Sequence, residues 1–228
     1  MHITVVIPVF NERDCIDELV ERVQSAYSKS RILFVDNGST DGTLERIACH
    51  DVDVLKHAVN QGYGKSLHEG VLHASSEVVV TIDGDLEYPP ECIPSLIERI
   101  EGKQSVVYGS RFLNRMKGSI PVTTRCGNLT VTRLFNAMYG QHLTDLYTGV
   151  KAFRRSEIAK HRFRRNGFGY VVEMAAYLSR TGTNIVEIPI SYAPRSRGSS
   201  KMSHLSETFK ALYWMILFRV LPINATDE

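Results

Sequence analysis

Two carboxylates separated by one glycine are the strongest chemical signal in this sequence. Asp83, Gly84 and Asp85 directly follow the apolar run VVVTI at 78–82. Mg²⁺ and Mn²⁺ prefer oxygen ligands, and one or two carboxylates leave coordination positions open for phosphate oxygens and water. Gly84 would let a ligand approach the backbone closely. We therefore expect Asp83 and Asp85 to bind a divalent cation, with Glu87 as a third oxygen donor; an acidic surface turn is the alternative.

Other polar clusters also follow predicted strands. Apolar runs predict strands at 3–8, 31–35, 51–57, 78–82 and 105–109, and helical patterns lie between them at 11–27, 44–49, 60–73 and 94–100. This alternation predicts a mainly parallel sheet flanked by helices. Ligands of such sheets bind beyond the carboxyl ends of the strands. We therefore expect the clusters at 11–12, 36–37, 60 and 83–85 to converge on one site.

The charge of the chain is divided unevenly along its length. Residues 1–102 contain 8 Lys/Arg and 18 Asp/Glu, a net charge of −10, whereas residues 103–228 contain 19 and 7, a net charge of +12. Two solvated faces of opposite sign are one interpretation. The other is that the acidic half holds a metal and the basic half holds phosphates or faces an anionic surface.

Several other classes of protein are disfavoured. The turn NQGYGKS at 60–66 has Leu67 where a dinucleotide fingerprint needs its third glycine, and P-loop, GxSxG and HExxH patterns are absent. The four cysteines form no CxxC pair, which favours a reducing compartment. We expect neither a signal peptide nor a membrane span, and no nucleic-acid partner. The predicted location is cytoplasmic.

Eight motifs in order resemble one enzyme family. PVFNE (8–12), VDNGSTDGT (35–43), NQGYGKS (60–66) and DGDLEYPP (83–90) resemble the family 2 glycosyltransferases of GT-A fold. GSRF (109–112), DLYTGVKAF (145–153), GFGYVVEM (167–174) and YAPRSRGSSK (192–201) look like the dolichyl-phosphate mannose synthase group. The resemblance implies a Rossmann-like α/β catalytic domain at 1–204. It would comprise a nucleotide-sugar and metal half at 1–102 and an acceptor half at 103–204, followed by an amphipathic C-terminal helix and tail at 205–228.

The resemblance also implies a reaction. A hexose, mannose first and glucose next, would pass with inversion from a GDP- or UDP-sugar to a polyprenyl or dolichyl phosphate, with Mg²⁺ or Mn²⁺ as cofactor. One alternative is transfer to a glycan or other hydroxyl acceptor, and another is a non-catalytic nucleotide-sugar-binding subunit. A sugar nucleotidyltransferase is disfavoured, because PVFNERD stands where that chemistry uses a Gly-rich, basic loop.

Donor-binding roles follow from the matched motifs. Residues around the nucleoside would come from the first two motifs, and Asn37 stands where the family often has a second Asp. Asp83 and Asp85 would hold the metal on the diphosphate, and Glu87 stands where the mannose synthases usually have Gln. The basic loop RSRGSSK would close over the diphosphate. The donor-binding set is Pro8, Phe10, Glu12, Val35, Asp36, Asn37, Lys65, Gly84, Arg195, Arg197, Ser200 and Lys201.

Acceptor-side roles rest on four residues. Arg111 and Arg125 are the candidates for the acceptor phosphate, because a guanidinium group matches phosphate oxygens in shape and charge. Asp145 and Glu173 match family positions near the sugar and the acceptor. Each would either orient the hexose or pair with an arginine. If the acceptor were a hydroxyl, one of these two would have to serve as its base.

Two segments predict contact with a membrane surface. KAFRRSEIAKHRFRR at 151–165 has seven Lys/Arg and one Glu, and it could lie on anionic headgroups or form an exposed basic helix. The run ALYWMILF at 211–218 is long enough for an interfacial helix with Tyr213 and Trp214 at headgroup level. Its alternative is a helix packed on the domain or on a second subunit. The chain is therefore expected to be peripheral at the cytoplasmic face of a membrane.

Overall fold

The computed structural model describes residues 1–102, 104–113, 120–193 and 204–221, without the side chains of 122, 123 and 204–209. Its strands are β1 (Ile3–Val9), β2 (Ser30–Asp36), β3 (Asp53–Lys56), β4 (Val78–Thr81), β5 (Val106–Ser110), β6 (Lys151–Arg154) and β7 (Val186–Pro189). Its α-helices are α1 (Ile16–Ala26), α2 (Thr43–Ile47), α3 (Tyr63–His73), α4 (Ile93–Glu101), α5 (Val122–Tyr139), α6 (Gly169–Arg180) and α7 (His204–Val220). Short 3₁₀ turns lie at Arg13–Cys15, Pro90–Cys92 and Arg155–Glu157.

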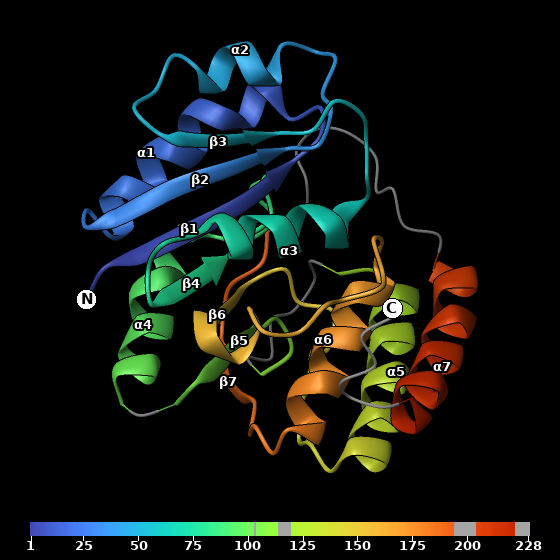
Figure 1. Ribbon diagram of the computed structural model, residues 1–228. Coiled ribbons are helices and arrows are strands. Elements are labelled where there is room, and N and C mark those ends of the chain that lie inside the picture. Colours follow the sequence, from blue (N-terminus) through green and yellow to red (C-terminus); the bar gives the residue numbers. More distant parts are fainter. Residues whose placement is uncertain (103, 114–119, 194–203, 222–228) are drawn as a thin grey trace.

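The described strands form one mixed, mostly parallel sheet in the order β3-β2-β1-β4-β6-β5-β7 (Figure 1). β1 pairs in parallel with both β2 and β4. The chain therefore adds β2 and β3 on one side of β1 and then returns to add β4 on the other side. Every residue of β1 is buried, which is typical of a central parallel strand covered on both faces. The predicted α/β class, the first five strands and the helices between them are confirmed.

The basic segment 151–165 is placed differently from both interpretations of it. Residues Lys151–Arg154 form β6, which runs antiparallel between β4 and β5 inside the sheet. Arg154 pairs with Glu77, and Arg155 donates to the carbonyl groups of Val71 and Leu72. The prediction of one continuous surface segment was wrong, because β6 lies inside a sheet covered on both faces and its first three residues are buried, including Lys151 with 1% exposure.

Alternate residues along β1 enter two separate apolar layers. Val5 and Ile7 pack with α1 and α4, whereas Val6 packs with α3, α5, α6 and α7 on the other face. The helices supply matching stripes at helical spacing, such as Ile16, Leu19, Val20 and Val23 in α1. The sheet is therefore covered on both sides, and its carboxyl edge is the place where loops can gather.

The last helix packs along α5 and α6 (Figure 1). Among its described side chains, Ala211, Met215 and Phe218 are buried, and Arg180 donates to the carbonyl groups of Phe218 and Leu221. Packing on the domain is thus confirmed for one face of α7, and the other face is exposed. Among the described residues, no helix combines the length and the apolar character that crossing a bilayer requires.

Helices α3 and α6 approach each other closely at Gly64. A Cβ atom there would lie 2.3 Å from Cβ of Tyr170 and 2.7 Å from the carbonyl oxygen of Gly167. Close backbone contact of this kind needs glycine on one side. It brings the start of α3 against the start of α6, where Tyr63 stacks on Phe168 with ring centroids 5.3 Å apart.

Substituting Gly64 with alanine should separate these two helices. We expect Gly64→Ala to lower the free energy of unfolding by roughly 1–3 kcal/mol, because the overpacking outweighs the gain in helix propensity. Urea unfolding followed by circular dichroism measures this change. Gly167→Ala is the matched control, since a Cβ at Gly167 would meet nothing within 4 Å. Equal stabilities of the two variants would contradict the assignment.

Candidate active site

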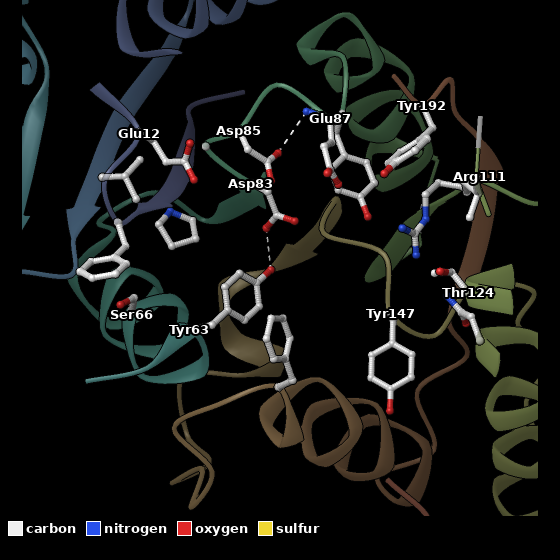
Figure 2. Close-up of a pocket in the computed structure, with 18 of the residues that line it drawn as sticks. Glu12, Tyr63, Ser66, Asp83, Asp85, Glu87, Arg111, Thr124, Tyr147 and Tyr192 are labelled. Carbon is white, nitrogen blue, oxygen red and sulfur yellow. Dashed lines mark hydrogen bonds between the residues drawn. The ribbon is translucent and has the colours of Figure 1, made fainter. Parts of the chain in front are cut away.

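A cavity of about 470 Å³ opens at the carboxyl ends of β1, β2, β4 and β5. Figure 2 shows acidic side chains gathered around Asp83, with Arg111 on the opposite wall. The predicted convergence of the clusters after the strands is therefore confirmed. The lining residues are Pro8, Val9, Phe10, Glu12, Asn37, Asn60, Tyr63, Ser66, Asp83, Gly84, Asp85, Glu87, Tyr88, Arg111, Ile120, Pro121, Thr124, Gly127, Asn128, Val131, Tyr147, Phe168 and Tyr192.

The Asp83 carboxylate is held from two sides. The hydroxyl of Tyr63 donates to Asp83 Oδ1 over 2.7 Å. The backbone at Gly149 lies so near Asp83 that a Cβ there would be 2.1 Å from Oδ2. Burial, and then the negative charge of Asp85, raises the pKa of Asp83 to about 6. The pocket thus holds two carboxylates whose mutual repulsion a bound cation would relieve.

The turn that presents these carboxylates is tightly constrained. Leu86 has a φ of 61°, a left-handed conformation that is uncommon for a residue other than glycine. The backbone N–H of Glu87 donates to Asp85 Oδ1 over 3.0 Å. Gly84 lies against β1, because a Cβ there would be 2.6 Å from Cγ1 of Val9. Glycine is therefore required at 84 for packing against β1.

The fit of these residues to a divalent cation rests on two carboxylates. Within the described ranges, no group of three or more His, Cys, Asp or Glu side chains is placed to share a metal ion. Glu87 also lines the pocket, and its role as a third oxygen donor stays a prediction. A pair of carboxylates facing a pocket still matches the donor set of an ion that takes its other ligands from phosphate and water.

A buried lysine lies beneath the acidic side of the pocket. Lys151 donates from Nζ to the carbonyl oxygen of Thr148, and Nζ lies 5.0 Å from the centroid of the Tyr108 ring. Burial lowers the pKa of Lys151 to about 8, although Asp83 and Asp145 favour its charged form. This lysine was predicted to lie on the surface, and it instead offsets part of the carboxylate charge from within the sheet.

The predicted nucleoside residues divide into lining and supporting groups. Pro8, Phe10, Glu12 and Asn37 line the pocket. Val35 and Asp36 are buried at the end of β2 and are not among the lining residues; Asp36 Oδ1 accepts the backbone N–H of Ser39. Lys65 is also outside the lining set and pairs with Glu69 over 2.9 Å.

Arg111 is held by a buried carboxylate. Asp145 accepts bonds from Nε and Nη2 of Arg111 over 2.7 and 2.8 Å, from its backbone N–H, and from Nδ2 of Asn128 over 2.9 Å. The Asp145 side chain has 0% exposure. Glu187 in turn accepts the backbone N–H groups of Thr144 and Asp145. Of the two roles considered for Asp145, pairing with an arginine is the one that the structure shows.

The remaining predicted residues are absent from the lining set or lie outside the described ranges. Arg125 is exposed on α5, with its guanidinium 6.0 Å from the centroid of the Phe112 ring. Glu173 is buried in α6, where its carboxylate accepts the backbone N–H groups of Arg164 and Arg165. Neither is among the lining residues. Arg195, Arg197, Ser200 and Lys201 lie outside the described residues.

Aromatic side chains form a large part of the wall, and of these only Phe10 was predicted as a site residue. Tyr88 and Tyr192 meet edge to face, and their ring centroids lie 5.5 and 5.6 Å from the Arg111 guanidinium. Tyr63 and Phe168 stack on the opposite side, and Tyr147 also lines the cavity. Each of them lies within one of the motifs that carried the resemblance. Position in a motif was the available signal, but the roles had been assigned mainly to charged side chains.

Removing the Asp145 carboxylate should leave a buried arginine without its partner. We expect Asp145→Ala to lower the free energy of unfolding by about 3–5 kcal/mol, because the Arg111 charge loses its compensation. Asp17→Ala, which breaks an exposed pair with Arg46, should change stability little. Denaturant unfolding of both variants makes the comparison. A small loss for Asp145→Ala would show that the pair contributes little.

Comparisons with known proteins show the family of this chain. The family model described as glycosyl transferase family 2 matches residues 4–162, more than half of the chain. The dolichol-phosphate mannosyltransferase of Pyrococcus furiosus is 26% identical, over 94% of this chain and 64% of that relative. The undecaprenyl-phosphate mannosyltransferase of Micrococcus luteus is 28% identical, over 89% of this chain and 88% of the relative. The chain thus spans less than two thirds of the length of the first of these.

Solved structures show the same fold. Glucosyl-3-phosphoglycerate synthase from Mycobacterium tuberculosis, in complex with Mn²⁺, uridine diphosphate and phosphoglyceric acid, has a TM-score of 0.76 at 19% identity. The match covers 97% of this chain and 79% of that one. Sheet order, pocket position, motif order and the matching family model lead to one conclusion: the chain belongs to glycosyl transferase family 2, and it has the GT-A fold of a glycosyltransferase.

Proposed function

We propose that this protein transfers a hexose, with inversion, from a nucleotide diphosphate sugar to a polyprenyl phosphate. Mannose from GDP-mannose is the first choice of donor, and glucose from UDP-glucose is the next. The observation that carries the proposal is the placement of Arg111 across one pocket from Asp83 and Asp85 (Figure 2). Relatives named for mannosyl transfer to dolichol phosphate and undecaprenyl phosphate support the acceptor class.

The acidic wall suits the donor. The nucleoside would lie along Pro8, Phe10, Glu12 and Asn37, and the diphosphate beside Asp83 and Asp85. A divalent cation bound there would offset the charge of the leaving diphosphate. Tyr63 keeps the Asp83 carboxylate in place through its 2.7 Å hydrogen bond. The chain's own contribution on this side is therefore to orient the donor and to hold its phosphates.

The opposite wall suits an acceptor that is already an anion. A phosphate needs a cation to position it and no base to activate it, whereas a sugar hydroxyl needs a base. Asp145 was one candidate for that base, but its carboxylate already accepts four hydrogen bonds. Glu173, the other candidate, is bound to backbone N–H groups in α6. These contacts favour the polyprenyl phosphate over a hydroxyl acceptor.

Part of the pocket lining is apolar. Ile120, Pro121, Val131 and Tyr147 belong to this apolar section, and Figure 2 shows Tyr147 on the same side of the pocket as Arg111. These side chains would pack against the first isoprene units of the acceptor and exclude water from the reacting phosphate. A free sugar hydroxyl gives no reason for such a lining, so the apolar section supports a lipid acceptor.

Transfer assays with the purified chain test the proposal directly. Labelled GDP- and UDP-sugars are offered with a short polyprenyl phosphate and Mn²⁺ or Mg²⁺, and the label in the lipid phase is counted. We expect one donor to give a lipid product, and Asp85→Asn to reduce its formation by roughly a hundredfold or more, because the leaving diphosphate loses its support. Asp53→Asn is the control, since Asp53 lies on the edge strand β3 and pairs with Arg31 of β2, and neither residue lines the pocket.

The alternatives predict different results in the same assay. Donor hydrolysis or transfer to soluble sugars, without label in the lipid phase, would favour a hydroxyl acceptor. Nucleotide-sugar binding without any release of nucleoside diphosphate would favour the binding subunit. Either result would overturn the polyprenyl-phosphate assignment.

We also propose that the exposed face of α7 rests on the membrane at its cytoplasmic surface. Tyr213, Ile216 and Val220 are 58%, 60% and 78% exposed and lie on the side of α7 away from the core. Lys210 and Arg219 are exposed on the same helix and would favour anionic headgroups. An apolar strip with neighbouring basic residues is typical of interfacial helices.

Placing a charge in this strip should weaken binding to vesicles. We expect Ile216→Asp to reduce association with phosphatidylglycerol-containing vesicles roughly tenfold, because the variant loses apolar burial and adds a negative charge. Val59→Asp is the matched control, since Val59 is 67% exposed at a different place on the surface. Cosedimentation measures both variants. Equal losses for the two would contradict a specific role for α7.

A further inference from the structure

A buried hydrogen-bond chain connects α3 with the end of the pocket assigned to the nucleoside. His57 follows β3 and is 4% exposed. Its Nδ1 lies 3.0 Å from Oδ1 of Asn37, and its Nε2 lies 2.7 Å from Oε2 of Glu69 in α3. Asn37 and Asn60 both line the pocket, whereas His57 does not. His57 therefore lies behind the pocket wall and contacts a lining residue without lining the cavity itself.

Backbone donors fix the orientation of both amides. The N–H of Gln61 donates to Asn37 Oδ1 over 2.8 Å, and the N–H of Gly62 donates to Asn60 Oδ1 over 2.9 Å. A backbone N–H can only donate, so the atom facing it must be the amide oxygen in each case. Nδ2 of Asn37 then donates to Asn60 Oδ1 over 3.0 Å. Neither amide can be reversed without placing two donors against each other.

This orientation determines the protonation of His57. Asn37 Oδ1 on one side of the ring and the Glu69 carboxylate on the other are both acceptors. Both ring nitrogens must therefore donate, which only the imidazolium form can do. Glu69 also binds Lys65 through Oε1 over 2.9 Å, so its carboxylate is shared between two cations. The charge on His57 is thus compensated within the chain of contacts.

The same contacts limit what Asn37 can offer a ligand. Its oxygen accepts from both Gln61 and His57, and one of its two amide protons is bound to Asn60. The second Nδ2 proton remains for a ligand. An acceptor is the complementary group, such as a nucleobase carbonyl or a ribose hydroxyl oxygen. An aspartate at this position would offer no such proton.

We propose that His57 is a charged positioning residue of the nucleotide pocket, which fixes Asn37 so that it presents a single donor to the nucleoside. This inference rests on the proposed function for the identity of the ligand. The protonation of His57 does not, because it follows from contacts within the free protein. Two experiments therefore address the two parts separately.

Nuclear magnetic resonance of the free protein tests the protonation. With ¹⁵N-labelled histidine near neutral pH, we expect both His57 ring nitrogens to carry protons, with the resonances assigned by their loss in His57→Gln. Glu69→Gln keeps an oxygen at the acceptor position but removes its charge, and it should favour the neutral ring. A His57 ring with one unprotonated nitrogen in the unmodified chain would overturn the proposal, whatever the protein transfers.

Nucleotide binding tests the positioning role. Calorimetry with GDP and UDP should show roughly tenfold weaker binding for His57→Gln, because the hydrogen bond to a charged donor is lost. In transfer assays the KM for the donor should rise while kcat at saturating donor stays within about twofold. His50→Gln is the matched control, since His50 also contacts a carboxylate, that of Asp17, but away from the pocket.

The two outcomes separate this inference from the proposed function. Unchanged nucleotide affinity in His57→Gln, or a loss of kcat without a change in KM, would overturn the positioning role. If the proposed function were wrong, the chain would bind nucleotide without forming a lipid product. The nuclear magnetic resonance and calorimetry experiments would still compare His57→Gln with the unmodified chain, because neither of them depends on a lipid acceptor. Thermal unfolding of His57→Gln shows that the compared protein is folded.

Discussion

The site depends on the burial of one carboxylate, that of Asp145, beneath the wall opposite Asp83. A buried carboxylate must be fully paired, and here the donors come from Arg111 and Asn128. The bidentate contact fixes the guanidinium group against Tyr88 and Tyr192. Glu187 on β7 accepts the backbone N–H of Asp145 and so holds the backbone that carries this carboxylate. The Arg111 guanidinium therefore has a fixed direction before any ligand binds, so that binding does not carry the cost of ordering a long side chain.

Local pattern was sufficient to predict the first half of the fold. Strands such as β1 and β4 are short apolar runs, and α1 and α4 have apolar stripes at helical spacing, so period and burial agree. The second half could not be predicted in the same way, because β6 is four residues long and contains Lys151 and Arg154. Its strand character arises from pairing with β4 and β5, and its lysine is tolerated through contacts distant in sequence. No local window contains that information.

The candidate site divides in the same way. Asp83, Asp85 and Glu12 were predicted because charged groups that follow strands are visible in the sequence, and Arg111 was predicted from the GSRF motif; all of them line the pocket. The roles of Asp145 and Glu173 were left open, since a carboxylate in a motif can face a ligand or a backbone N–H. Only the folded chain distinguishes the two. The aromatic wall and His57 were missed because their functions come from contacts with other side chains.

The antiparallel strand β6 has a consequence for the order in which the protein forms during synthesis. β1 to β4 pair among themselves and are complete by residue 81. β5 pairs only with β6 and β7 among the described strands, so residues 106–110 have no partner in the sheet until residues 151–154 leave the ribosome. The acidic side chains at 83 and 85 are thus synthesised before Asp145, the carboxylate that holds Arg111. A nascent chain passes through a stage in which the residues of the acidic wall are present and the buried partner of Arg111 is still missing.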